Sequence, residues 1–537
     1  MVKRNLRVRI HLIEVFRDPR NARLPLNGGL GTRHELRRRD FWHTEIIFSR
    51  QTYLLLFAAI IAFGGCLWGS FHFDDYSLFA SNLWRPFDIR PVTYLTFWLN
   101  EQMGGRNPAG YHAVNLLLHL IAIVLLWEAL GKLLPPQARV IATGIFALHP
   151  FQAETVNYVF ARSALMAAVL CLAALVGWTR EHPWQSVAWF AAALLAKEEC
   201  AAFPVFLLLL WLAKRGDRKA LPPIALMIVL ALAAGIRVML VARSTPGSGA
   251  GAQATVSASS YLVTQGVGIL RYLRMLILPW GFTIDPDIRI PTLIAGAAAW
   301  AAVLILAGVA AFRFKNAGAG FWFLAGLVLL LPSSSIFPAT DLAADRRMYL
   351  PMIGFAACVG LVMERLRPAF FVPILLVLAS LSFERTLTWR TEESLWTDAV
   401  DKAPQKIRPR IQLARAVEPS RAIPILEGAK ERAPNDATIA SEEGRAYLNL
   451  GRPDQALVQF GRALALAPHD AANFNNRGAA LLALGQRDVA RADFERALAI
   501  DPCQFDARLN LKHLGAVAPR ASQCRFSDEQ RAALASN

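Results

Sequence analysis

The chain has few charged residues for its length. Of its 537 residues, 18% are charged and 55% are hydrophobic, whereas soluble domains carry about 25% charged residues. The deficit lies between residues 50 and 385, where apolar runs of 17–22 residues recur. Runs of that length can cross a hydrocarbon core of roughly 30 Å. The shortage of charge therefore excludes an ordinary soluble protein and predicts a polytopic membrane protein.

Cysteine is scarce as well, and no Cys-x-x-Cys metal pattern occurs among the six cysteines. Cys503 and Cys524 fall in a C-terminal region that we expect to be exported, where disulfides persist. The sequence leaves open whether they form a bridge or remain free thiols. The other four lie in or beside apolar runs and are interpreted as small apolar residues: Cys66, Cys171, Cys200 and Cys358.

Acidic residues are outnumbered by basic ones, 40 to 57, which gives a net charge of +17. Nucleic-acid binding is a poor explanation, because the basic residues cluster next to apolar runs, where cytoplasmic anchoring accounts for them. The Arg-rich N-terminal region fits either an anionic inner leaflet or a solvated tail. About 50 residues precede the first apolar run, too many for a signal peptide, so that run is predicted to be a retained span.

Basic residues fall on every second connection between the apolar runs and in the N-terminal region. The positive-inside rule therefore places those parts in the cytoplasm. The opposite loops (71–112, 149–162, 197–199, 242–290 and 336–349) and everything after 384 are then predicted to lie outside. Eleven spans are predicted, near 51–70, 113–133, 138–148, 163–179, 184–196, 200–213, 221–241, 291–312, 319–335, 350–364 and 369–383.

Residues 261–280 are also apolar enough to span, but they contain Arg271 and Arg274. A crossing at this point would place the basic residues at 313–315 on the outer side. We therefore predict an interfacial or re-entrant helix on the outer face.

The C-terminal region contains repeats. Residues 437–470 and 471–504 have 34 residues each, the period of a tetratricopeptide repeat. A degraded copy precedes them at 403–436, and a helix at 505–515 would cap the stack. Such arrays often hold a peptide or a partner on a concave surface, although this one could simply pack against the membrane half.

The predicted fold class is therefore all-α, with a polytopic membrane domain followed by an α-solenoid of tetratricopeptide repeats. The predicted order is a basic cytoplasmic tail (1–50), a membrane domain (51–385), a linker (386–402), a repeat array (403–515) and a C-terminal tail (516–537).

Asp74 and Asp75 stand side by side about one turn after the first span. Ionisable groups beside an apolar span are functional candidates, and a carboxylate here could accept the proton of an attacking hydroxyl. The alternative is that the pair caps a loop helix. Neighbouring carboxylates could also bind Mg²⁺ or Mn²⁺, but no spacing in the chain requires a metal.

Further charged residues fall on the same predicted face, which is what an active site at a membrane boundary requires. The cations could hold a phosphate. Structural alternatives remain: Glu154 and Arg162 could form an ion pair, and Lys197 could snorkel to the interface. His112, Asn115 and His119 share one helical face, where hydrogen bonding between helices is favoured over metal binding.

These residues resemble the tetratricopeptide-containing transmembrane O-mannosyltransferases. The resemblance covers roughly residues 50–510 and depends on the order of several short motifs. The motifs are Asp74-Asp75, Arg90-Pro91-Val92-Thr93, Asn107-Pro108-Ala109-Gly110-Tyr111-His112-Ala113-Val114-Asn115, His149-Pro150 with Glu154 and Arg162, Lys197-Glu198, Asp345-Arg346, and Trp389-Arg390. The chain departs from the family after Arg162, where Ser163-Ala164-Leu165 replaces a pattern with an acid, and its array is shorter.

The resemblance implies a GT-C glycosyltransferase that moves a mannose-like sugar from a polyprenyl-phosphate carrier to Ser or Thr hydroxyls of exported proteins. By this similarity, Asp74 is the base and Asp75 assists it or positions the acceptor. Fixed cations would neutralise the leaving phosphate, and the candidates are Arg162, Lys197 and Arg346. The expected supporting residues are Arg90, His149, Glu154, Glu198 and Asp345.

Two other functions stay open: the same fold acting on a lipid or glycan acceptor, and a membrane scaffold without catalysis. The expected partners are the bilayer, the lipid-linked sugar and a protein acceptor held by the array. The short array and compact loops favour a bacterial inner-membrane protein, with its active site and array in the periplasm.

Overall fold

The computed structural model describes residues 49–535, except 73, 80–89, 245–255, 315–316, 340, 520–523 and 525. The predicted basic tail, residues 1–50, lies almost entirely outside the described residues. The described residues form helices and connecting segments with no β-strand among them, so the all-α prediction is confirmed.

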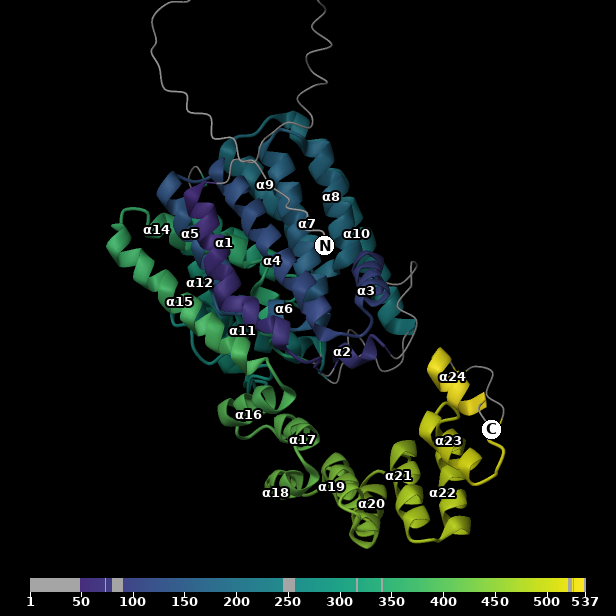
Figure 1. Ribbon diagram of the computed structural model, residues 1–537. Helices are drawn as coiled ribbons and strands as arrows, with labels where there is room; N and C mark the ends of the chain where they lie inside the picture. Colours follow the sequence, from purple (N-terminus) through teal and green to yellow (C-terminus); the bar gives the residue numbers. More distant parts are fainter. Residues whose placement is uncertain are drawn as a thin grey trace, which may run out of the picture. The chain divides into compact units, whose positions relative to one another are not determined.

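The membrane half consists of fifteen labelled α-helices, and its long helices run side by side (Figure 1). The helices are α1 (Arg50–Phe63, continued by a 3₁₀ turn to Trp68), α2 (Asp74–Ser77), α3 (Pro91–Gly104), α4 (Pro108–Gly131), α5 (Pro136–Leu148), α6 (Phe151–Asn157), α7 (Arg162–Thr179), α8 (Pro183–Ala196), α9 (Phe203–Lys214), α10 (Leu221–Ser244), α11 (Ala258–Ile277), α12 (Leu293–Phe312), α13 (Ala319–Leu330), α14 (Met352–Val362) and α15 (Pro368–Thr388).

Each of the eleven predicted spans coincides with one of these helices, but the count of eleven is not confirmed. Among the described residues, six helical segments are both long and apolar enough to cross a membrane, and α13 and α14 are shorter apolar helices. In the segment that contains α7, 72% of the most apolar stretch is buried, so this helix is central. In the segment that contains α10, the buried share is 11%. The six are Arg50–Trp68, Pro108–Gly131, Val159–Thr179, Arg218–Val241, Leu293–Phe312 and Pro368–Thr388.

Glycine lets the helices approach closely in the membrane half. A Cβ atom on Gly354 of α14 would lie 2.3 Å from the backbone nitrogen of Gly326 in α13. One on Gly360 would lie 2.6 Å from the carbonyl oxygen of Ala138 in α5. Small residues at such crossings allow the backbone-to-backbone packing that holds membrane helices together. α14 is therefore clamped between α13 and α5, and the 3₁₀ turn just before it, Asp345–Met348, is held at the end of the bundle.

The amphipathic helix α11 runs across the ends of other elements. The Trp300 indole of α12 donates to the carbonyl of Leu262, near the start of α11 (2.7 Å). Further along α11, Arg271 pairs with Asp345 (2.9 Å). Near its end, the carbonyl of Leu276 lies 3.4 Å from His149 Nε2. Among the described residues, α11 is not one of the helices that are long and apolar enough to cross a membrane.

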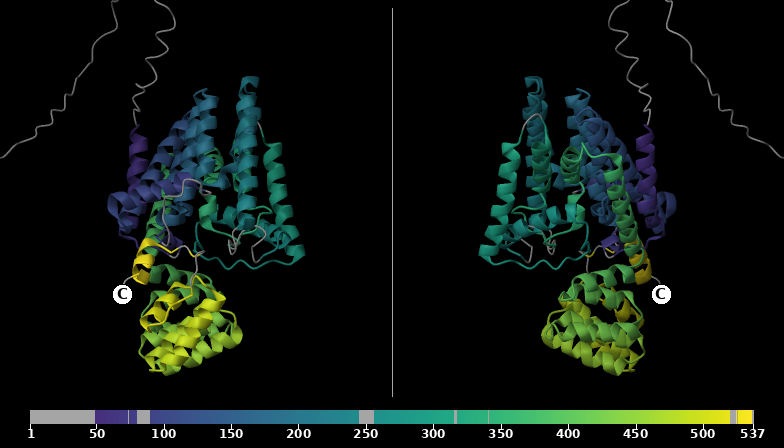
Figure 2. Two further views of the ribbon diagram at one scale, coloured as in Figure 1. Left: turned by 90° about the vertical axis from the view of Figure 1, so that its right-hand side faces the viewer. Right: turned by 90° about the vertical axis from the view of Figure 1, so that its left-hand side faces the viewer.

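The repeat array is a succession of paired helices (Figure 1; Figure 2). In the two clear repeats, Gly444 faces Phe460 and Gly478 faces Phe494, and both phenylalanines are fully buried. The helices are α16 (Glu392–Lys402), α17 (Ile407–Ala416), α18 (Pro419–Lys430), α19 (Ala437–Asn449), α20 (Pro453–Leu466), α21 (Ala471–Ala483), α22 (Arg487–Ile500), α23 (Phe505–His513) and α24 (Asp528–Ala535).

Two features at the borders of the array were not determined by the sequence. Cys503 and Cys524 are joined in a disulfide, with Cα atoms 5.3 Å apart. The predicted linker, 386–402, is largely helical: it contains the end of α15 and all of α16. Within it, Leu395 and Trp396 are buried in an apolar cluster with Tyr158 of the membrane half.

The close approach of α21 and α22 can be tested at Gly478. A Cβ atom there would lie 2.6 Å from the Phe494 ring, so Gly478→Ala should destabilise the array by about 1–3 kcal/mol through overpacking. Gly461, in α20, has nothing within 4 Å of its Cβ position. Gly461→Ala should therefore leave the array intact or stabilise it by up to about 1 kcal/mol. Hydrogen exchange of α19–α22 in the full chain measures both effects, and equal exchange in the two variants would contradict this account of the packing.

Candidate active site at one end of the membrane helices

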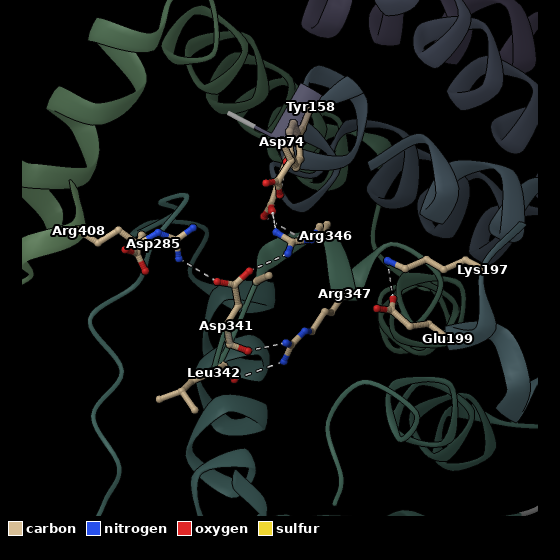
Figure 3. A network of polar contacts seen from close by, with 12 residues as sticks. Asp74, Tyr158, Lys197, Glu199, Asp285, Asp341, Leu342, Arg346, Arg347 and Arg408 are labelled. Atoms are coloured by element: carbon tan, nitrogen blue, oxygen red, sulfur yellow. Dashed lines mark hydrogen bonds and ion pairs between the residues drawn. The ribbon is translucent and has the colours of Figure 1, made fainter. Parts of the chain in front are cut away.

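Four connections far apart in the sequence meet at one end of the helices. The Tyr158 hydroxyl donates to Asp74 Oδ2 (2.8 Å), joining the first connection to the second. Arg346 pairs with Glu154 (2.5 Å), joining the second to the loop before α14. Arg90 pairs with Glu198 (2.6 Å), joining the first to the turn after α8. The contacts therefore unite the loops that the charge pattern assigned to one face (Figure 3).

The two adjacent aspartates have different surroundings. Asp75 is fully buried and accepts two backbone hydrogen bonds, from His72 (2.9 Å) and from Phe160 (2.7 Å). It therefore attaches the short helix α2 to the junction of α6 and α7. Asp74, one residue earlier, is exposed. The buried hydrogen bonds of Asp75 fix the backbone here and so keep Asp74 next to Tyr158.

Burial raises the pKa of Asp75 to about 8. A buried carboxyl group disfavours its charged form, so Asp75 is largely protonated at neutral pH and the repulsion expected between two adjacent carboxylates is relieved. Burial together with the nearby Asp74 and Asp75 also raises the pKa of Tyr158 far above its usual range. Its hydroxyl therefore stays a hydrogen-bond donor, which orients the Asp74 carboxylate.

Arg346 is the central cation of the cluster (Figure 3). Glu154 accepts a hydrogen bond from its Nη1 (2.5 Å) and another from its backbone nitrogen (3.0 Å). Asp341 accepts one from its Nη2 (2.8 Å). Burial opposes the charged form, but the Glu154 and Asp341 carboxylates raise the pKa of Arg346 above its usual range. Arg346 is therefore a permanent cation fixed by a buried acid.

A narrow cleft with a cavity volume of about 20 Å³ lies beside Arg346. Its polar end is formed by Lys197, Arg346 and Arg347 together with Glu199, which pairs with Lys197 (2.9 Å). Its other lining residues are mainly small or apolar side chains of α7, α13 and the start of α14: Ala164, Ala167, Ala168, Leu329, Leu350 and Pro351. A cationic end next to apolar walls has the chemistry that binds an anionic headgroup with a hydrocarbon tail. At a volume of about 20 Å³ the lining side chains must move apart to admit such a group.

The remaining predicted supporting residues stabilise the loops. Arg90 binds Glu198 through two nitrogens (2.6 and 3.1 Å); burial opposes the charge, yet Arg90 holds the pKa of Glu198 at about 2. Asp345 pairs with Arg271 of α11. His149 is fully buried, accepting from the backbone of Phe151 (3.2 Å), with its Nε2 3.4 Å from a carbonyl oxygen of α11.

Arg162, the third predicted phosphate ligand, makes its contacts elsewhere. Its side chain is fully buried, and its guanidinium donates to Asn115 (2.8 Å), Asn100 (2.6 Å) and the carbonyl of Tyr111 (2.9 Å). It also stacks 4.4 Å from the centre of the Phe97 ring. Neutral acceptors saturate it, so Arg162 joins α3, α4 and α7. Within the described part of the chain, Glu154 forms its ion pair with Arg346 and not with Arg162.

The polar residues on one face of α4 make hydrogen bonds to other segments, as predicted. His112 lies 3.3 Å from the carbonyl of Ser70, and Asn115 donates to that of Tyr158 (3.2 Å). His119 Nδ1 lies 2.8 Å from the Tyr349 hydroxyl. Among the described residues, no group of three or more His, Cys, Asp or Glu side chains could hold a metal ion.

The sequence did not single out Tyr158 or Arg408 for the site. Tyr158 is one of nine tyrosines, and nothing in its local pattern indicates that it would meet Asp74. Arg408 lies in α17 of the array, yet it binds Asp341 (3.0 Å), the same acid that binds Arg346. Arg408 and Asp341 are 67 positions apart in the sequence, so no local pattern indicates that they meet.

Comparison with known proteins gives relatives of one kind. A family model for the tetratricopeptide repeat matches residues 471–502. A protein O-mannosyl-transferase of Caenorhabditis elegans is 26% identical over 419 residues, which are 68% of this chain and 60% of that protein. The protein O-mannosyl-transferase TMTC3 of Homo sapiens is 25% identical over 491 residues, 75% of this chain and 54% of that protein.

A third relative, the protein O-mannosyl-transferase TMTC4 of Mus musculus, is 25% identical over 427 residues, 63% of this chain and 56% of that protein. The chain thus spans little more than half the length of these relatives, all three of which are eukaryotic. The bacterial inner membrane and the periplasmic orientation remain predictions. The chain is similar to protein O-mannosyl-transferases of the TMTC group over most of its length, and the predicted resemblance to that family is confirmed.

Proposed function

We propose that this protein is a membrane glycosyltransferase that moves a mannose-like sugar from a polyprenyl-phosphate carrier to Ser or Thr hydroxyls of exported proteins. The observation that carries the proposal is the placement of an exposed carboxylate, Asp74, on the same end of the helices as a cationic cleft with apolar walls. The names of the relatives support transfer of mannose to protein.

In the proposed reaction, the acceptor hydroxyl attacks the anomeric carbon of the sugar, and the bond from that carbon to the carrier phosphate oxygen breaks. Asp74 takes the hydroxyl proton, and the Tyr158 hydroxyl orients its carboxylate for this role (2.8 Å). The phosphate leaves with the bonding electrons and remains on the polyprenyl chain. Arg346 and Lys197 neutralise it, and Arg347, which also lines the cleft, adds a third positive charge.

The other predicted residues act through these groups. Asp75 positions Asp74, and Glu154 holds Arg346 in place. Arg90, Glu198, Asp345 and His149 stabilise the loops, while Arg162 is left out of the phosphate site because it is saturated by neutral acceptors. The acceptor segment reaches Asp74 from the array, because repeat arrays commonly hold a peptide on their concave surface.

Asp74→Asn should lower kcat for sugar transfer by about 100- to 10,000-fold, because the amide cannot accept the hydroxyl proton. Transfer of labelled mannose from polyprenyl-phosphate mannose, with the full chain in lipid nanodiscs, measures this effect. Asp217→Asn is the matched control, since Asp217 is exposed and caps a short helix elsewhere in the chain. Full activity in the Asp74 variant would rule out the proposed base.

Lys197→Gln should raise KM for the lipid donor about tenfold, the effect of losing one charge-assisted hydrogen bond, with a smaller change in KM for the acceptor. Lys197 pairs with a partly exposed acid, Glu199, so its loss does not strand a buried charge. Arg180→Gln, which removes an exposed pair with Glu128, serves as the control. An unchanged donor KM in the Lys197 variant would remove Lys197 from the phosphate site.

Asp75 should give the protein a recognisable pH dependence of stability. Its pKa of about 8 in the folded state exceeds its value of about 3.9 in the unfolded chain. The folded state therefore holds an extra proton between those values, and stability falls as pH rises from about 4 to about 8, by up to about 1.4 kcal/mol per pH unit.

Asp75→Asn should remove this slope, because the amide does not titrate. Thermal unfolding between pH 5 and 8 in one detergent measures it, with Asp217→Asn again as the control. If the wild type and Asp75→Asn lose stability in parallel over that range, the assignment of a protonated Asp75 fails.

A further inference from the structure

One carboxylate connects the membrane half to the repeat array at the candidate phosphate site. Asp341 Oδ2 accepts from Arg346 Nη2 (2.8 Å), and Asp341 Oδ1 accepts from Arg408 Nη1 (3.0 Å). Arg346 lines the cleft, whereas Arg408 lies in the first turn of α17 (Figure 3). The acid therefore has one cationic partner in each part of the protein.

Arg346 binds two acids, Glu154 and Asp341, and Asp341 is the one that a ligand can displace. Glu154 is 4% exposed and accepts both a side-chain and a backbone hydrogen bond from Arg346. Removing it from Arg346 would strand a buried charge. The Asp341 side chain is 29% exposed and binds Arg346 through a single nitrogen. An incoming phosphate would therefore compete with Asp341 for Nη2 and leave Glu154 in place.

Asp341 is an anion under ordinary conditions. Burial works against its charge, but Arg346 and Arg408 together hold the pKa of its carboxyl at about 2. Two anions cannot share one guanidinium edge without repulsion, so a bound phosphate requires that the Asp341 carboxylate have another cation to bind. Arg408 is that cation, because it already holds the other oxygen.

Arg408 is free to serve this role because other residues attach the array at this point. Lys406 pairs with Asp285 and donates to the carbonyl of Pro286 (3.0 Å). Lys402 donates to the carbonyl of Phe282 (2.9 Å). Arg408 itself is half exposed, and its Nε lies 4.0 Å from Asp285 Oδ2. Its position is therefore fixed by neighbours, while its own bond to Asp341 is not needed for attachment.

Building on the proposed function, we propose that Arg408 of the repeat array is a positioning residue for the lipid donor. In the unliganded protein, Asp341 occupies the place on Arg346 that the carrier phosphate takes. When the phosphate binds, Arg408 retains the displaced carboxylate and keeps it from competing. The array thereby contributes to donor binding as well as to the handling of an acceptor.

The test is a double-mutant cycle on binding of polyprenyl phosphate, without sugar, to the full chain in nanodiscs, followed by native mass spectrometry. Asp341→Asn should tighten binding about tenfold, because it removes the competing charge from one charge-assisted hydrogen bond. Arg408→Gln should weaken binding by a similar factor, since Asp341 then binds Arg346 alone. The double variant should bind like Asp341→Asn.

Two controls separate this mechanism from loosening of the array. Lys406→Gln weakens the attachment at Asp285 without touching Asp341, and Arg421→Gln removes an exposed pair with Glu393 within the array. Both should bind polyprenyl phosphate as the wild type does. Unfolding temperatures and elution profiles verify that each variant is folded before binding is compared.

The outcomes are distinct. Equal weakening by Arg408→Gln in the wild-type and Asp341→Asn backgrounds would overturn the inference, because Arg408 would then act independently of Asp341. Unchanged or weaker binding by a folded Asp341→Asn variant would overturn it too. Failure of the wild type to bind polyprenyl phosphate would overturn the proposed donor and this inference together, whereas additive variants with normal wild-type binding would overturn this inference alone.

Discussion

The bond between Glu154 and Arg346 is the interaction on which the candidate site depends. Glu154 is buried at the start of α6, and a buried carboxylate without a partner costs several kcal/mol. The loop before α14 must therefore bring a cation to it, and Arg346 does so with both its guanidinium and its backbone nitrogen. The same loop carries Arg347, which lines the cleft, and Asp341, which binds Arg346.

The paired aspartates obtain different properties from their surroundings alone. Asp75 is enclosed and satisfies two backbone nitrogens, so burial raises its pKa to about 8. Asp74 projects into solvent beside a tyrosine hydroxyl. Different surroundings are a common way to give two neighbouring acids distinct roles. The repulsion that makes the pair conspicuous in the sequence is thus removed by placing one acid inside the protein.

The sequence predicted the elements better than it predicted the site. Apolar length and the 34-residue period predicted helices and repeats, since both depend on local pattern. The choice between Arg162 and Arg346 did not follow, because both are arginines in loops of the same predicted face. Arg162 donates hydrogen bonds to Asn115 and Asn100, which lie 47 and 62 positions away in the sequence. Such partners are determined by tertiary packing. The same applies to Arg408, whose partner lies in another domain.

Part of the segment that was predicted as a linker packs against the membrane half. Tyr158, which orients Asp74, stacks on Trp389 at 5.8 Å and belongs to one apolar cluster with Leu395 and Trp396 of α16. The carbonyl oxygen of Trp389 in turn lies 2.8 Å from His72 Nε2. The first helix after the membrane half, α16, therefore helps to position the candidate base through its packing against Tyr158. The repeats that begin at α17 follow directly from this helix.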